Sequence, residues 1–208
     1  MKAATGRLQM MCVLLAASGL RAGELLGLEC RHFDGTSVKV EQSIWGGKVQ
    51  TPKTPNAKRY VDLHPDVAAL LKAFIAGRES GFVFRASSGR PLGQANMLKH
   101  ELHPLLETLG ISKRGFHCFR RFRNTYLRQC RCPDTILKTW MGHATRGDMS
   151  ALYDRSALDV QYRRDVCVAM ATGFDVPKTL TPKLKKSEQA TSELGVIGRQ
   201  EELTSCKA

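Results

Sequence analysis

The sequence lacks the features that would place a protein in a membrane or outside the cell. The apolar residues 8–20 fall short of the length of a membrane span, and Gly19 and Arg21 interrupt the run. The same run continues into a basic motif instead of a cleavage site, so it does not resemble a secretory signal peptide. These absences predict a cytoplasmic protein that does not associate with membranes.

Cysteines and acidic residues also form no pattern that is typical of a metal site. The seven cysteines are odd in number and irregular in spacing, which favours reduced thiols over a disulfide framework. Cys130 and Cys132 form a C-x-C pair without the second pair that a zinc site needs. The chain has neither an acidic cluster of the two-metal kind nor a glycine-rich phosphate loop. We therefore expect no metal and no other cofactor.

Negative charge is scarce in the part of the chain that is expected to fold. The net charge is +13 and the pI is about 9.7. Residues 175–208 hold only 6 of the 32 basic residues and 5 of the 19 acidic ones, so residues 1–174 carry a net charge of +12. A basic excess within the fold itself indicates a surface for a polyanion such as nucleic acid.

Residues 1–174 are expected to form one domain with a sizeable core, because 42% of the 208 residues are hydrophobic. Beta-forming residues and turn signals between residues 36 and 63 predict two or three short antiparallel strands. The expected fold class is α+β, mostly helical with a small antiparallel β-sheet, followed by a disordered polar tail over 175–208. Apolar spacing predicts helices over 2–17, from about 22, 66–76, 94–109 with a break near Pro104, 117–130, 133–140 and 149–153.

Two arginines about one hundred positions apart occupy polar motifs within apolar helical sequence. Arg21 lies in the string ASGLRAGELLGL, in the predicted turn between two buried helices, where an arginine has little structural reason to be. Glu24 follows three residues later, close enough to orient Arg21 or to cap the second helix. His117 and Arg120 are also three apart, so both can point at one ligand. Because a guanidinium offers fixed donors to phosphate oxygens, these motifs indicate a phosphate-binding site.

Three more residues extend the pattern. Lys53 lies beside the turn at 55–57, where a β-hairpin over about residues 48–59 could present its ammonium group at the tip. His143 ends the string WMGH, and Tyr153 follows it by ten residues in a helical setting. A phenolic oxygen at Tyr153 would be a nucleophile for a phosphodiester that the arginines hold.

The order of these motifs resembles the catalytic domain of tyrosine recombinases, the phage integrase family, over about residues 8–170. The nucleophile of that family usually follows the histidine by nine residues, so the gap of ten to Tyr153 implies one extra loop residue. Tyr162 is the competing candidate, nineteen residues beyond the histidine. The resemblance implies a supporting role for Glu24 and catalytic roles for Arg21, Lys53, His117, Arg120, His143 and Tyr153.

The resemblance also implies a mechanism of DNA strand cleavage and rejoining. Tyr153 would form a 3′-phosphotyrosyl link while Lys53 protonates the departing 5′-oxygen, and His117 would act as general base or hold a phosphate oxygen. Arg21 and Arg120 would bind the non-bridging oxygens, and His143 would add a further hydrogen bond. The partner implied is double-stranded DNA, on which the protein would act as a homo-oligomer. A second group of arginines, assigned to DNA backbone contacts or solvent, consists of Arg121, Arg123 and Arg128.

Two other functions remain open at this point. A type IB topoisomerase shares the tyrosine chemistry but relaxes supercoils, and a prophage remnant could bind DNA without catalysis. The sequence before residue 2 has no room for the N-terminal DNA-binding domain of tyrosine recombinases. We therefore expect a fragment or a truncated gene product of a recombinase or integrase.

Overall fold

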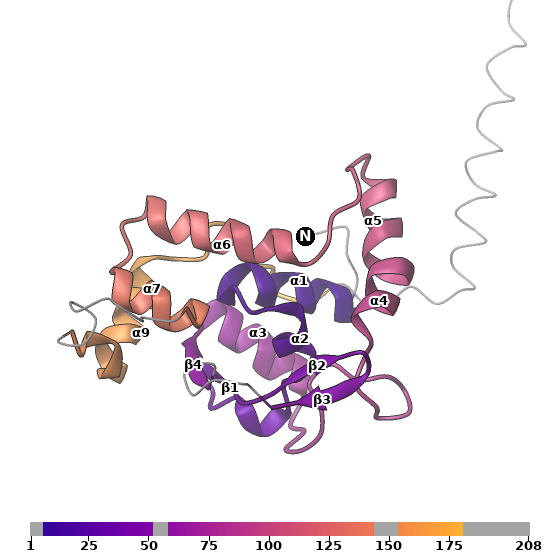
Figure 1. The fold of residues 1–208 in the computed structure, drawn as a ribbon, viewed down its shortest axis with the longest axis horizontal. Coiled ribbons are helices and arrows are strands. Elements are labelled where there is room, and N and C mark those ends of the chain that lie inside the picture. Colours follow the sequence, from indigo (N-terminus) through magenta and orange to yellow (C-terminus); the bar gives the residue numbers. More distant parts are fainter. Residues whose placement is uncertain (1–5, 52–57, 144–153, 181–208) are drawn as a thin grey trace, which may run out of the picture.

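The computed structural model describes residues 6–51, 58–143 and 154–180 (Figure 1). Helices form most of the fold, as predicted, and the strands are short. Within the described ranges, no helix is long and apolar enough to cross a membrane. The helices are α1 (Gly6–Ser18), α2 (Ala22–Leu26), α3 (Pro65–Ile75), α4 (Gln94–Met97), α5 (His103–Thr108), α6 (His117–Gln129), α7 (Asp134–Met141) and α9 (Val160–Ala169).

Helix α1 is the centre of the core. It packs against α3 on one side and α6 on the other (Figure 1). Eleven of its thirteen residues are buried, because it is apolar on nearly every face. The backbone of Gly19 then turns into the left-handed region (φ +68°) and ends the helix. The positive φ angle favours glycine here, and a Cβ atom at this position would lie 2.6 Å from Cε of Met141, so that side chain on α7 would have to shift.

The strands form two antiparallel pairs. Strand β1 (Ser37–Val40) pairs with β4 (Arg59–Asp62), and β2 (Ser43–Trp45) pairs with β3 (Lys48–Gln50). In the described residues β3 therefore pairs with β2 and not with β4, which corrects the hairpin expected after residue 48. The tight turn of the β2–β3 pair falls at Gly46 and Gly47, a turn signal in the sequence, and both glycines have positive φ angles that suit a hairpin.

The segment between the sheet and α6 contains the predicted break. Helix α4 continues into a π-helical turn (Leu98–Leu102) and then into α5, whose first turn holds Pro104. Proline lacks the amide hydrogen of a regular helix, which accounts for the irregular turn just before it. Among residues 82–84, Phe82 forms a β-bridge with Glu29.

Two predictions, one for Arg123 and one for the tail from residue 175, differ from the structure. Arg123 was assigned to DNA or solvent, but its side chain is buried and donates from Nη1 to the carbonyls of Ala171 (2.9 Å) and Thr172 (3.4 Å). Arg121 and Arg128 are exposed, as expected. The tail was expected to be disordered from residue 175, but the described part of it is not. Val176 and Leu180 pack against the core, and the rest of the tail lies outside the described residues.

Candidate active site

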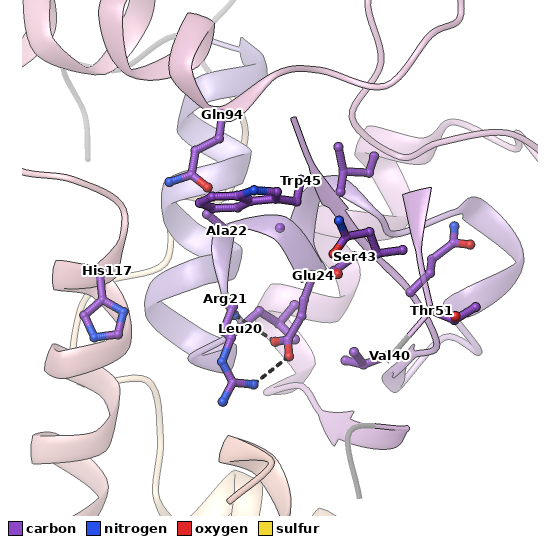
Figure 2. A pocket seen from close by; sticks show the side chains of 14 residues that line it. Leu20, Arg21, Ala22, Glu24, Val40, Ser43, Trp45, Thr51, Gln94 and His117 are labelled. Carbon is purple, nitrogen blue, oxygen red and sulfur yellow. Dashed lines mark hydrogen bonds and ion pairs between the residues drawn. The ribbon is translucent and has the colours of Figure 1, made fainter. Parts of the chain in front are cut away.

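Arg21 lies at the start of α2 with an extended backbone (φ −70°, ψ 149°) and half of its side chain exposed. Its Nη1 donates to Oε1 of Glu24 at 2.9 Å, and its backbone N–H donates to Oε2 of Glu24 at 2.9 Å (Figure 2). Glu24 therefore both caps α2 and orients the Arg21 side chain, so the two roles predicted as alternatives are combined. The free face of the guanidinium remains available to a ligand.

The Glu24 carboxylate is buried and has a second cationic partner. Arg59 on β4 donates from Nη1 to Oε1 at 3.1 Å and from Nη2 to Oε2 at 2.9 Å. Burial alone would raise the pKa of Glu24, but the hydrogen bonds and charges of Arg59 and Arg21 outweigh it and lower the pKa. The carboxylate is therefore ionised at neutral pH. Sequence reasoning missed Arg59, although its alternation with Val61 places it on the buried face of the strand.

Arg120 projects from α6 into the same region, and its side chain is buried. Its Nη1 donates to the carbonyl of Gly19 at 2.8 Å, and its Nη2 donates to the carbonyl of Met141. Burial and, to a smaller extent, the positive charge of Arg21 lower the pKa of Arg120 to about 10, while the negative charge of Glu24 acts in the opposite direction. Arg120 still carries its charge at neutral pH. Its position depends on two backbone carbonyls that lie far apart in the sequence.

His143 follows α7 and is adjacent to Arg120, with Nε2 3.3 Å from Nη2 of the guanidinium. Partial burial lowers the pKa of His143, and the positive charges of Arg120 and Arg21 lower it further. The imidazole is therefore mainly neutral at pH 7. Gly142 makes the turn into His143 with φ +61°, and a Cβ atom there would lie 2.8 Å from Nη1 of Arg59.

His117 begins α6 and is exposed. It lines a cavity of about 600 Å³ together with Arg21, and the two side chains face it from different elements (Figure 2). The opposite wall comes from the β2–β3 hairpin, including Ser43 and the exposed Trp45. His117 and Arg120 lie on one helix as predicted, but only Arg120 contacts His143 in the described part of the chain.

Lys53 and Tyr153 both lie outside the described residues. Thr51, the last described residue before Lys53, lines the cavity, and Arg59 after it contacts Glu24. The described residues on both sides of Lys53 therefore lie beside the site. After Tyr153, the carboxylate of Asp154 accepts a hydrogen bond from Oγ1 of Thr135 on α7 at 2.8 Å. Tyr162, the competing candidate, lies on α9 and is partly exposed.

The sequence matches the phage integrase family over residues 1–159, which is most of the chain. The chain belongs to the phage integrase family. A tyrosine recombinase XerC-like protein from Caldanaerobacter subterraneus subsp. tengcongensis is 25% identical over 71% of this chain and 45% of its own length. This family member therefore spans about half the length of the curated relative that it matches.

Two solved structures share the fold of this family member. The Tn1549 transposon integrase, in complex with circular intermediate DNA, superposes with a TM-score of 0.57 at 16% identity, covering 90% of this chain and 59% of that one. The integrase from mycobacterium phage Brujita gives a TM-score of 0.58 at 16% identity, covering 90% of this chain and 57% of that one. At this identity the likeness is one of fold, and it confirms the predicted α+β class.

The site of this integrase family member combines two charged guanidiniums with a neutral imidazole. Arg120 contacts His143 and the carbonyl of Met141 at the end of α7, and Arg21 is near enough for its charge to lower the pKa of both Arg120 and His143. Such fixed donors can bind a tetrahedral anion and stabilise additional negative charge on it. In the described part of the chain, no three histidine, cysteine or acidic side chains are grouped as they would be around a metal ion.

Proposed function

We propose that this chain breaks and rejoins double-stranded DNA by the tyrosine recombinase reaction, with Tyr153 as the nucleophile. The observation that carries the proposal is the convergence of Arg21, Arg120 and neutral His143 in a member of the phage integrase family. A phosphodiester gains negative charge in the transition state of its cleavage, and preorganised donors stabilise that charge. The site contains such donors on rigid elements.

Arg21 and Arg120 bind the two non-bridging oxygens of the scissile phosphate, each through its guanidinium. His143 donates a third hydrogen bond, for which its neutral form must carry the proton on the nitrogen that faces the phosphate. His117, which lines the same cavity as Arg21, takes the phenolic proton or holds a phosphate oxygen.

Tyr153 attacks the phosphorus, and the bond from phosphorus to the 5′-oxygen breaks. Lys53 supplies a proton to that oxygen, and a 3′-phosphotyrosyl link remains. Attack by a 5′-hydroxyl group of another strand reverses these steps and rejoins the DNA. The roles of Lys53 and Tyr153 rest on their place in the order of family motifs and on the position of the residues that flank them.

Double-stranded DNA is the proposed partner. The net charge of +12 on residues 1–174 supports this proposal, and so does the DNA in the related Tn1549 integrase complex. Binding should depend strongly on salt, because it releases several counterions from the DNA. A modest rise in ionic strength should therefore lower the affinity on the order of 10³-fold. We also propose that the chain acts as a homo-oligomer on DNA, as members of this family do.

The decisive experiment incubates the full chain with nicked duplex DNA, which traps the cleaved state, followed by denaturing electrophoresis. A covalent protein–DNA adduct is the expected result. Tyr153→Phe removes only the attacking oxygen, so it should abolish the adduct while changing DNA affinity by no more than about threefold. Tyr162→Phe is the matched control and should leave the adduct intact.

Other outcomes would assign the alternative functions. Salt-dependent binding without an adduct would indicate a DNA-binding remnant. An adduct together with relaxation of supercoiled DNA and no strand exchange would indicate a topoisomerase-like activity. Loss of the adduct in Tyr162→Phe but not in Tyr153→Phe would assign the nucleophile to α9.

A further inference from the structure

Arg59 is a buried arginine directly behind the proposed phosphate site. Its side chain is only 3% exposed, against 50% for Arg21. Both guanidiniums bond the carboxylate of Glu24, Arg21 from the cavity side and Arg59 from the interior. Oε1 of Glu24 accepts hydrogen bonds from the Nη1 atoms of both arginines, at 2.9 Å and 3.1 Å. One negative charge therefore lies between two positive ones.

This arrangement determines how much positive charge Arg21 can offer to a ligand. If Glu24 had Arg21 as its only partner, the two charges would cancel next to the phosphate. Because Arg59 donates two hydrogen bonds to the carboxylate in a buried setting, its charge compensates Glu24 there. The group of three then carries one net positive charge, which faces the cavity at Arg21.

Arg59 is fixed in place by contacts on its other side. Its Nε donates to the carbonyl of Trp140 at 2.8 Å, and the backbone of Gly142 packs close to the guanidinium. Trp140 is held a second time by β4, since its Nε1 donates to Oδ2 of Asp62 at 2.8 Å. The guanidinium therefore cannot move out of the pair with Glu24 without disturbing the end of α7.

We propose that Arg59 is a positioning residue for DNA cleavage, which holds the charge of Glu24 so that Arg21 stays available to the scissile phosphate. The proposal rests on the proposed function. It differs from a purely structural role because the effect of Arg59 must depend on the charge of Glu24. A packing role would persist whether or not Glu24 is ionised.

A double-mutant cycle tests this dependence. Arg59→Met removes the charge and keeps an apolar stem, and it should slow adduct formation at saturating DNA by about 10- to 100-fold, less than the 10²- to 10³-fold cost of deleting a direct donor. Arg59→Met combined with Glu24→Gln should react within about threefold of Glu24→Gln alone, because no uncompensated carboxylate remains beside Arg21. An equal loss in both backgrounds would overturn the proposal.

The pH dependence gives a second readout. The charged or titratable groups around Glu24 are Arg21, Arg59, Arg120 and, beyond them, His143. Without Arg59, burial should raise the pKa of Glu24, so the carboxyl group should protonate within the working range and release Arg21. The rate of Arg59→Met relative to wild type should therefore rise as the pH falls from 8 to 6. Arg59 also lowers the pKa of His143, so the same ratio is measured with Glu24→Gln present in both proteins, where the rise should be absent. A flat ratio with Glu24 intact would contradict the proposal.

Two further variants control for the possibility that Arg59→Met acts through a folding defect. Arg59→Lys keeps a cation next to Glu24 but lacks the fork, so its rate should lie between those of wild type and Arg59→Met. Arg78, whose guanidinium donates to the carbonyls of Ile75, Phe82 and Val83 away from the site, supplies the matched control. Arg78→Met should lower thermal stability without changing the rate at saturating DNA.

A binding measurement separates this proposal from the proposed function. If wild type forms no adduct, the cleavage function fails, and the affinity for the same nicked duplex at fixed salt still tests Arg59. Arg59→Met should then weaken binding, by less than Arg21→Ala, and Arg59→Met combined with Glu24→Gln should bind within about threefold of Glu24→Gln alone. An equal loss in both backgrounds, or no loss in Arg59→Met, would overturn the role of Arg59.

Discussion

Helices α1 and α6 are both thirteen residues long and pack against each other, but they bury different kinds of side chain. The buried residues of α1 are nearly all apolar, and they include Leu14 and Leu15. Those of α6 are Arg120, Arg123 and Leu127. Apolar side chains can be buried against any apolar neighbour, whereas a buried guanidinium needs acceptors at fixed positions.

The acceptors for the two α6 arginines are backbone carbonyls of other segments. Arg120 donates to Gly19 at the end of α1, and Arg123 donates to Ala171 after α9. Although the two arginines are one turn apart, only Arg120 contacts His143 in the described part of the chain. Burial of an arginine therefore does not by itself indicate a catalytic role. The partners of its guanidinium indicate whether it belongs to the candidate site or stabilises the fold elsewhere.

The largest expected effect comes from Arg120→Ala. The variant loses a cation and donor of the proposed phosphate site, so adduct formation on nicked DNA should fall by about 10²- to 10³-fold. DNA affinity should fall as well, because in the proposed mechanism the guanidinium contacts the phosphate before and during attack. Arg120→Lys, which keeps a charge but not the planar fork, should recover only part of the rate. An unchanged rate in Arg120→Ala would indicate that Arg120, like Arg123, only stabilises the fold.

Leu14→Ala tests the apolar side of the comparison. Leu14 has no exposed surface, so its truncation should leave a cavity and lower the free energy of unfolding by about 2–5 kcal/mol, measured by urea denaturation. The adduct rate at saturating DNA should not change at a temperature where the variant is folded. Leu158, which is 72% exposed, supplies the control, and Leu158→Ala should alter stability only slightly.

Arg123→Met tests whether the second buried arginine is structural. Its removal leaves the carbonyl of Ala171 without this donor, so the free energy of unfolding should fall by about 1–3 kcal/mol. The adduct rate at saturating DNA should equal that of wild type. A rate loss similar to that of Arg120→Ala would show that the two arginines do not divide their roles as proposed.

The smallest expected effect is a pH effect at His143. Its pKa is lowered in the folded protein, so NMR titration should give a midpoint below the ordinary value of 6.5. The corresponding contribution to stability is present above pH 6.5 and is lost as the pH falls, because the unfolded state binds the proton more readily. Bound DNA phosphate should raise the midpoint. A midpoint that DNA leaves unchanged would separate His143 from the phosphate site.

Local sequence patterns predicted well those elements of the fold that depend on residues close together in the sequence. The apolar period of residues 8–17 and the break at Gly19 predicted α1, and the three-residue spacing of Arg21 and Glu24 predicted their contact. The predicted hairpin after Lys48 was wrong for the described residues, because strand partners depend on registers that a single strand does not encode.

The sequence by itself determined the order of the site residues, the helical character of the fold and the excess of positive charge. Only the tertiary structure decided which arginines serve the site. Arg59 and Arg123 look like ordinary surface residues in the sequence, but their partners Glu24 and Ala171 lie 35 and 48 residues away. The acceptors for a buried charge are brought together by folding, so the partners of Arg59 and Arg123 could not be read from the residues next to them in the sequence.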